Sequence, residues 1–363
     1  MNRPDAALVL NDGTVFEGYA VGFVPEEGVT TGEFVFNTAL SGYQEVLTDP
    51  SYAGQIIAFT YPHIGNYGIT PLDDESIHPW AKGIVVREIS DLPSNWRSAG
   101  PLEGFLIQHR IPAIAGIDTR RLTKHLRSSG ALPGAFGNAP REVLLAASKV
   151  AKGTDQMDYV SLVTTHEPYE RGGDGPRIVA LDYGIKSTMV RQLADRFRVI
   201  VMPADASADE ILSHRPDGLF LSNGPGDPAA LTPQVATIAA LVERLPIFGI
   251  CLGHQLLATA LGASTYKLPF GHHGSNHPVK DLETGRIEIT AQNHNYAVTA
   301  DGLKAAHVSH VNLNDGVVEG IAAPSLRAFS VQYHPEAGPG PHDARYLFDR
   351  FDRLLETGSL EAL

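Results

Sequence analysis

Hydrophobic and polar positions follow different patterns in the two halves of the chain. In the first half, short apolar runs are separated by turn residues, and residues 8–18, with Asn11-Asp12-Gly13 in the middle, predict a β-hairpin. Further apolar runs in this half predict single strands, at 34–37, 56–60, 84–87 and 113–116. Helical patterns cover 102–109 and 118–127. This mixture of strands and helices indicates an α+β domain.

In the second half, apolar strands alternate with helices from residue 177 onward. Such alternation is typical of a parallel sheet with crossover helices. The later strands are predicted at 199–202, 218–222 and 246–250, and the helices between them at 208–214 and 233–244. The predicted fold class is therefore α/β, with a mostly parallel central sheet in the C-terminal domain and a smaller α+β domain before it.

The two patterns are separated by residues 166–176, which contain three glycines and two prolines. This composition is typical of a linker. The sequence thus predicts an N-terminal domain at 1–165, a linker at 166–176 and a C-terminal domain at 177–363. A chain of 363 residues fits two domains of ordinary size.

The chain has one cysteine, and its setting is distinctive. An apolar run at 246–250 leads into Gly249-x-Cys251-x-Gly253, and a stretch of good helix formers follows at 255–261. Strand, sharp turn and helix is the context of a nucleophile elbow, in which the helix offers backbone N–H groups to a developing negative charge. The alternative is a small buried hydrophobic residue, but the two flanking glycines favour the nucleophile.

Composition limits the partners and the compartment. Twenty-eight basic against 41 acidic residues give a net charge of −13, which disfavours nucleic acid and anionic membranes as main partners. A single cysteine excludes an internal disulfide framework and fits a reducing cytosol. No signal-peptide pattern is present, and no apolar run reaches the ~18 residues of a membrane helix. We therefore expect a cytoplasmic protein.

A histidine and a carboxylate that could serve the cysteine follow a predicted strand at 329–333. Pro335 favours an extended His334, so His334 and Glu336 project to the same side. The carboxylate could then hold one imidazole nitrogen and leave the other to act as a base on Cys251. The alternative is a histidine and a glutamate that merely flank a turn proline.

Two glycine-containing loops are further candidate sites. Residues 222–228 follow a strand, where ligands of open α/β sheets bind, although an ordinary turn has the same pattern. With the N–H of Leu252, the N–H of Gly224 or Gly226 could bind an oxyanion. Residues 271–277 hold three histidines but no cysteine or carboxylate, so we expect a surface loop there and no metal site.

Sequence motifs carry a resemblance to known families. Pro-Ile-Phe-Gly-Ile-Cys-Leu-Gly-His-Gln at 246–255, Ser-Asn-Gly-Pro-Gly-Asp-Pro at 222–228 and His-Pro-Glu at 334–336 resemble the class I, or triad, glutamine amidotransferases. Other segments narrow the resemblance to the small chain family of carbamoyl phosphate synthase. These segments are 36–38, 41–45, 47–52, 61–66, 117–120, 270–278 and 334–341.

The resemblance implies roles for particular residues. Cys251 would be the nucleophile that attacks the side-chain amide of glutamine, His334 the base and then the acid, and Glu336 its orienting partner. The implied glutamine contacts are Ser51, Gly224, Gly226, Leu252, Gln255, Asn293, Asn295 and Tyr296. At 295 and 296 some members have Gly-Phe. Asparagine is the non-glycine residue best suited to a left-handed backbone, and tyrosine keeps the ring.

The resemblance also implies partners. The small chain would release ammonia, which passes through an internal tunnel to a large chain. The large chain would use bicarbonate and two ATP to make carbamoyl phosphate for arginine and pyrimidine synthesis. ATP and Mg are expected on the large chain and no cofactor on this one, in agreement with the lack of a Gly-x4-Gly-Lys-Ser/Thr loop. A heterodimer is implied, and a higher oligomer of heterodimers stays open.

Three alternatives differ in function. A glutaminase of anthranilate or GMP synthesis would lack the N-terminal domain. A non-catalytic regulatory or scaffold subunit would not need an intact set of Cys251, His334 and Glu336. A peptidase or γ-glutamyl hydrolase would act on extended substrates without a partner.

Overall fold

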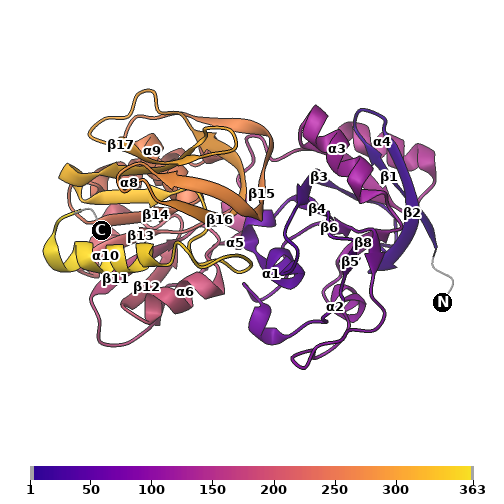
Figure 1. The fold of residues 1–363 in the computed structure, drawn as a ribbon, viewed down its shortest axis with the longest axis horizontal. Coiled ribbons are helices and arrows are strands. Elements are labelled where there is room, and N and C mark those ends of the chain that lie inside the picture. The colour runs from indigo at the N-terminus through magenta and orange to yellow at the C-terminus, as the bar shows by residue number, and fades with distance from the viewer. Residues whose placement is uncertain (1–3, 361–363) are drawn as a thin grey trace. The chain divides into compact units, whose positions relative to one another are not determined.

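The computed structural model describes residues 4–360, which form two compact units (Figure 1). The first unit runs to Asp155 and also includes Pro269–His273; the second comprises Gln156–Leu268 and continues from Gly274. Within the predicted linker 166–176, Tyr169–Arg171 forms strand β10 of the second unit. This strand could not be predicted, because one half-buried and two exposed residues leave no hydrophobic pattern. The domain limits 1–165 and 177–363 stay predictions.

The strands of the first unit close into a barrel in the order β1-β2-β8-β6-β4-β3-β9. The predicted hairpin is confirmed, since β1 and β2 pair antiparallel with Leu8 opposite Phe16. Closure leaves no strand edge open to another chain. The bounds are β1 (Asp5–Leu10), β2 (Val15–Gly22), β3 (Thr30–Asn37), β4 (Gln55–Phe59), β6 (Gly83–Val85), β8 (Pro112–Ala115) and β9 (Leu132–Gly137).

Helices and short elements complete the first unit. The predicted helix at 118–127 is α3, and its N-terminus is capped by the Asp118 carboxylate, which accepts a hydrogen bond from the Arg121 N–H at 2.9 Å. The helices α1 and α4 were not predicted: half of the six residues of α1 are polar, and α4 buries only Leu144 and Ser148. The elements are α1 (Tyr43–Thr48), α2 (Leu102–Gln108), α3 (Thr119–Ser129), α4 (Arg141–Val150), β5 (His63–Ile64), β7 (Glu88–Ile89) and the 3-10 turns η1 (Pro50–Tyr52) and η2 (Pro71–Asp73).

The second unit contains a mixed sheet in the order β10-β12-β11-β13-β14-β19-β18-β16-β15-β17. The strands from β12 to β19 are parallel, whereas β10 and the strands from β18 onward are antiparallel. The bounds are β11 (Arg177–Asp182), β12 (Arg198–Pro203), β13 (Gly218–Leu221), β14 (Ile247–Ile250), β15 (Thr265–Asp281), β16 (Ile287–Val298), β17 (His307–Asn312), β18 (Val318–Ala323) and β19 (Ala328–Val331).

This mixed sheet corrects the expectation of a mostly parallel one. The parallel strands were recognised because buried βαβ strands are continuous apolar runs. The antiparallel strands β15 to β18 were missed, and in β16 and β17 most of the buried residues are polar. The predicted surface loop at 271–277 is likewise wrong: it is part of β15, and His272 and His273 are buried.

Helices cover both faces of the parallel strands (Figure 1). Along β11, Val179 faces the core formed with α8 and α9, and Ile178 faces the core formed with α6 and α10. This period of two, with both sides buried, accounts for the apolar runs in the sequence. The helices are α5 (Val160–Val163), α6 (Ser187–Ala194), α7 (Ala208–Ser213), α8 (Thr232–Leu241), α9 (Leu252–Ala260) and α10 (Tyr346–Thr357), with 3-10 turns η3 (Pro228–Ala230) and η4 (Pro324–Leu326).

Helix lengths bear on the membrane question. Among residues 4–360, none of the helices combines the length and the apolar character that crossing a membrane requires.

His254 in α9 is buried and carries a testable pH effect. Burial, with a smaller contribution from His310, lowers the pKa of His254 to about 3. The unfolded chain, with a histidine pKa of about 6.5, therefore binds more protons below that pH. The contribution of His254 to stability is complete above pH 6.5 and is lost as the pH falls toward 3.

We expect His254→Asn to make the protein less acid-sensitive. The asparagine amide can keep the 2.8 Å contact between position 254 and Ser330 Oγ, but it cannot titrate. Between pH 6 and 5, the free energy of unfolding from urea denaturation should fall less steeply than in wild type, by up to about 1.4 kcal/mol per pH unit. Equal slopes for the two proteins would contradict a neutral buried His254.

Candidate active site

Cys251 stands at a sharp turn between β14 and α9. Its backbone has φ 55° and ψ −105°, a conformation that non-glycine residues rarely adopt. The turn is held from both sides, since the Cys251 N–H donates to the Val331 carbonyl at 2.9 Å and the Gln255 N–H donates to the Cys251 carbonyl at 3.1 Å. The predicted strand–turn–helix geometry around Cys251 is thus confirmed.

The two glycines of the motif are required by close backbone approach. A methyl group at Gly253 would lie 2.2 Å from the carbonyl oxygen of Leu221, and one at Gly249 would lie 2.8 Å from the carbonyl oxygen of Gly253. Both distances are too short for any side chain. The glycines therefore allow α9 to start directly against β13 and β14, with Cys251 at the turn.

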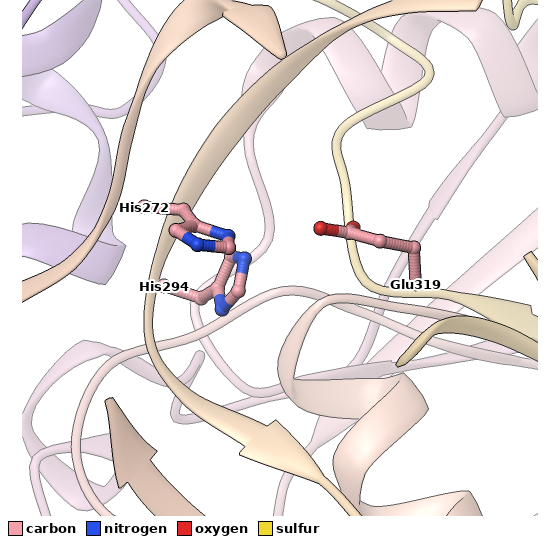
Figure 2. A group of neighbouring side chains, drawn as sticks. All are labelled: His272, His294 and Glu319. Carbon is pink, nitrogen blue, oxygen red and sulfur yellow. The ribbon is translucent and has the colours of Figure 1, made fainter. Parts of the chain in front are cut away.

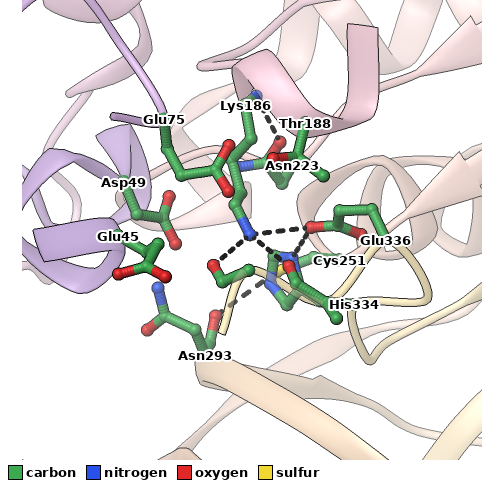
Figure 3. A network of polar contacts seen from close by, with 12 residues as sticks. Glu45, Asp49, Glu75, Lys186, Thr188, Asn223, Cys251, Asn293, His334 and Glu336 are labelled. Carbon is green, nitrogen blue, oxygen red and sulfur yellow. Dashed lines mark hydrogen bonds and ion pairs between the residues drawn. The ribbon is translucent and has the colours of Figure 1, made fainter. Parts of the chain in front are cut away.

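His334 and Glu336 meet as the sequence predicted. His334 Nδ1 lies 2.7 Å from Glu336 Oε1, and both side chains are buried (Figure 3). The His334 N–H donates to the Ala291 carbonyl of β16 at 2.9 Å, which fixes the backbone there. His334 Nε2 has no hydrogen-bond partner among the described residues. The carboxylate thus orients the ring, and Nε2 stays available to the thiol.

Lys186 is a member of this site that the sequence reasoning missed. Its Nζ donates to Glu336 Oε1 at 3.1 Å and to the carbonyl oxygens of Ala337 at 2.7 Å and Gly338 at 2.8 Å (Figure 3). Lys186 is only 2 % exposed and Glu336 is fully buried. One signal was present in the sequence: Lys186 follows β11, and parallel strands bring their carboxyl ends to one edge of a sheet.

Charge sets the protonation states of the pair. Burial alone would lower the pKa of His334, but the Glu336 carboxylate and Cys251 raise it, to about 10. Burial would raise the pKa of Glu336, but Lys186 and His334 lower it, to about 2. Lys186 therefore keeps Glu336 ionised, and ionised Glu336 makes the His334 ring a stronger base.

The loop at 222–228 lies against the elbow. A Cβ at Gly224 would lie 2.2 Å from the carbonyl oxygen of Tyr183 and 2.8 Å from Leu252 Cδ2, so only glycine fits at this position beside Leu252. Gly226 adopts φ 91°, which also favours glycine. The structure thus brings Gly224 beside Leu252, whereas Gly226 packs near the Met157 carbonyl.

Strand β16 supplies three of the predicted contact residues. The Cys251 thiol donates to the Asn293 carbonyl at 3.5 Å, and Gln255 Nε2 donates to the Tyr296 carbonyl at 2.9 Å. Asn295 is part of the strand and has no positive φ, so the tolerance of asparagine for a left-handed backbone is not needed at this position. A strand residue needs no left-handed conformation, whichever side chain it carries.

A chain of buried hydrogen bonds links β16 to its neighbour β18. Gln292 links His294 to Glu319: its Oε1 lies 2.9 Å from His294 Nε2, and its Nε2 donates to Glu319 Oε2 at 3.0 Å. Figure 2 shows His294, which lies on β16, and Glu319, which lies on β18. The link holds β16 against β18, and β16 carries Asn293 and Tyr296.

Comparisons with known proteins match both halves of the chain. Residues 8–136 match the family "Carbamoyl-phosphate synthase small chain, CPSase domain", and residues 179–354 match "Glutamine amidotransferase class-I". A carbamoyl phosphate synthase small chain of Symbiobacterium thermophilum is 50% identical over 361 residues, which cover 97% of this chain and 99% of that protein.

The chain belongs to the carbamoyl phosphate synthase small chain family. A pyrimidine-specific small chain of Bacillus subtilis is also similar, with 47% identity over 355 residues that cover 98% of this chain and 97% of that one. The family's function is that of the glutaminase small subunit of carbamoyl phosphate synthase, with an N-terminal CPSase domain and a C-terminal class I amidotransferase domain.

Membership in the small chain family decides among the alternatives. Glutaminases of other synthases and stand-alone hydrolases do not account for a matched CPSase domain together with a matched amidotransferase domain. In the CPSase domain, Ser51 lies in the turn η1 and is largely buried, and its N–H donates to Asp49 Oδ1 at 2.9 Å. Its predicted contact with glutamine stays a prediction.

Proposed function

We propose that Cys251, His334 and Glu336 form a catalytic triad that hydrolyses L-glutamine to glutamate and ammonia through a thioester. The observation that supports this most directly is the 2.7 Å contact between His334 Nδ1 and Glu336 Oε1, with His334 Nε2 left available. The strained turn that carries Cys251 is the second support.

The reaction follows from these positions. His334 Nε2 takes the proton of the Cys251 thiol, and the sulfur attacks the side-chain amide carbon of glutamine. The amide oxygen becomes an oxyanion, which the N–H groups of Leu252 and Gly224 or Gly226 stabilise. His334 then gives its proton to the departing ammonia, which leaves a thioester. Water, deprotonated by His334, cleaves the thioester and releases glutamate.

Binding of glutamine is proposed to use the contact residues that the resemblance implies. Residues near the elbow and on β16 would hold the substrate around Cys251, and Ser51 would contribute from the CPSase domain. The full proposed set is Ser51, Gly224, Gly226, Leu252, Gln255, Asn293, Asn295 and Tyr296. No metal is assigned to this site.

The proposed partner is a large chain, as the name of the small chain relatives suggests. The two would form a heterodimer, with assembly into a higher oligomer of heterodimers left open, and the ammonia would pass to the large chain. The large chain would bind ATP and Mg and use bicarbonate to make carbamoyl phosphate for arginine and pyrimidine synthesis. This chain would need no cofactor and would act in the cytoplasm.

One assay tests the proposal. Ammonia release from glutamine is measured for the isolated chain and for its complex with the matching large chain, ATP and bicarbonate. We expect a slow rate alone and a faster rate in the complex, accompanied by carbamoyl phosphate. The absence of ammonia release in both settings would overturn the proposed activity, and equal rates in both would overturn the coupling.

A further inference from the structure

Gln332 is a buried residue near the triad that has no part in the reaction described above. It lies between β19 and His334, and its N–H donates to the Glu319 carbonyl of β18 at 2.8 Å. Its Oε1 accepts a hydrogen bond from Gln255 Nε2 at 3.0 Å. Its own Nε2 has no partner among the described residues. The one side-chain hydrogen bond that Gln332 makes is therefore directed at Gln255.

The direction of this hydrogen bond is fixed by a backbone carbonyl. Gln255 Nε2 also donates to the Tyr296 carbonyl at 2.9 Å, and a carbonyl can only accept. The NH₂ group of Gln255 must therefore face Tyr296, and Gln332 must present its oxygen. These two acceptors use both hydrogens of the amide. Gln255 Oε1 makes no hydrogen bond with any residue in the described part of the chain.

The position of Gln255 relates this oxygen to the substrate. Gln255 lies one turn beyond Cys251 in α9, and its amide reaches β16 at Tyr296. The same strand contacts the Cys251 thiol through the Asn293 carbonyl. The Gln255 amide thus lies between helix α9 and strand β16, the two elements that flank the Cys251 thiol. An acceptor there fits a hydrogen-bond donor of the ligand, and a charged donor would form the stronger bond.

We propose that Gln332 is a positioning residue that holds the Gln255 amide with its oxygen toward the substrate, as the acceptor for the α-ammonium group of glutamine. This inference rests on the proposed glutaminase function and adds to it the origin of selectivity for an amino acid. A carboxamide without the ammonium group would gain nothing from Gln332. Gln332 would thus contribute to recognition without touching the substrate.

Binding measurements on a chain with Cys251→Ala test the inference, because no ligand is consumed. L-Glutamine is compared with glutaramate, the same molecule without the amino group, by isothermal titration calorimetry. Gln332→Met removes the acceptor at similar size. We expect it to weaken glutamine binding roughly 10- to 100-fold, the usual effect of a lost charged hydrogen bond, and to change glutaramate binding less than about twofold.

A second variant separates positioning from general support. Gln332→Glu keeps an oxygen acceptor, and it gives up no hydrogen bond because Nε2 of Gln332 has no partner. It should restore the preference for glutamine over glutaramate. In proteins with Cys251 intact, Gln332→Met should raise KM for glutamine much more than it lowers kcat, and Gln332→Glu should reverse that effect.

Other outcomes would overturn the inference. An equal loss of affinity for both ligands in Gln332→Met would show that the residue only supports the site. Unchanged affinity of Gln332→Met for glutamine would show that the Gln255 amide does not depend on the hydrogen bond to Gln332 for its orientation. If the Cys251→Ala chain with Gln332 intact bound neither ligand, the proposed substrate itself would fail, and the inference with it.

Discussion

Replacing Cys251 with alanine should reduce the release of ammonia from glutamine by about 10⁴-fold or more. The loss is this large because His334 and Glu336 serve the reaction only through the sulfur, so the triad fails as a unit. The protein should keep its fold, since alanine occupies the same strained turn and leaves the backbone hydrogen bond to Val331 in place. The measurement is ammonia release at saturating glutamine, with circular dichroism to compare the folds.

External ammonia provides the matched control for Cys251→Ala. In the complex with the large chain, ammonium chloride bypasses glutamine hydrolysis, so carbamoyl phosphate synthesis from ammonia should proceed as in wild type. Glutamine should also still bind to the variant. If Cys251→Ala released ammonia at more than about one hundredth of the wild-type rate, another residue would be the nucleophile, and the triad would be wrongly assigned.

Lys186→Met should cause the largest loss of stability among single substitutions near the site. The methionine has a similar length but no charge, so the fully buried Glu336 would lose the cation that lies 3.1 Å from its Oε1. Removing one partner of a buried ion pair typically costs about 3–5 kcal/mol, because the remaining charge is left uncompensated. Glutaminase activity should fall as well. The pKa of Glu336 would rise, and its carboxylate would orient the His334 ring and raise the pKa of His334 less effectively.

A double variant distinguishes this electrostatic cause from a packing defect. In Lys186→Met with Glu336→Gln, neither charge is buried, so part of the lost free energy of unfolding should return while the activity stays low. Lys304→Met, at an exposed position of the second unit, should change stability by less than about 0.5 kcal/mol. The free energy of unfolding is measured by urea denaturation. If the double variant lost as much of it as the two single variants together, Lys186 and Glu336 would not be coupled.

The strands of the βαβ region and the elbow could be read from local sequence because their causes are local. A strand buried on both faces must be apolar throughout, which marks β11 to β14. The elbow needs small residues on both sides of Cys251, which marks the motif. His334 and Glu336 were also predictable as a pair, because an extended backbone before Pro335 places residues two apart on the same side.

Local sequence was therefore enough to predict the sharp turn at Cys251, the pairing of His334 with Glu336 and the strand–helix alternation of the second unit. The residues that join these features come together only in the folded chain. Lys186 is about 150 residues from Glu336 along the chain, and Gln332 acts through Gln255, so neither partner is visible from spacing. The mixed sheet is also visible only in the structure. Long strands with buried polar residues resemble loops in the sequence until their hydrogen-bond partners on neighbouring strands are known.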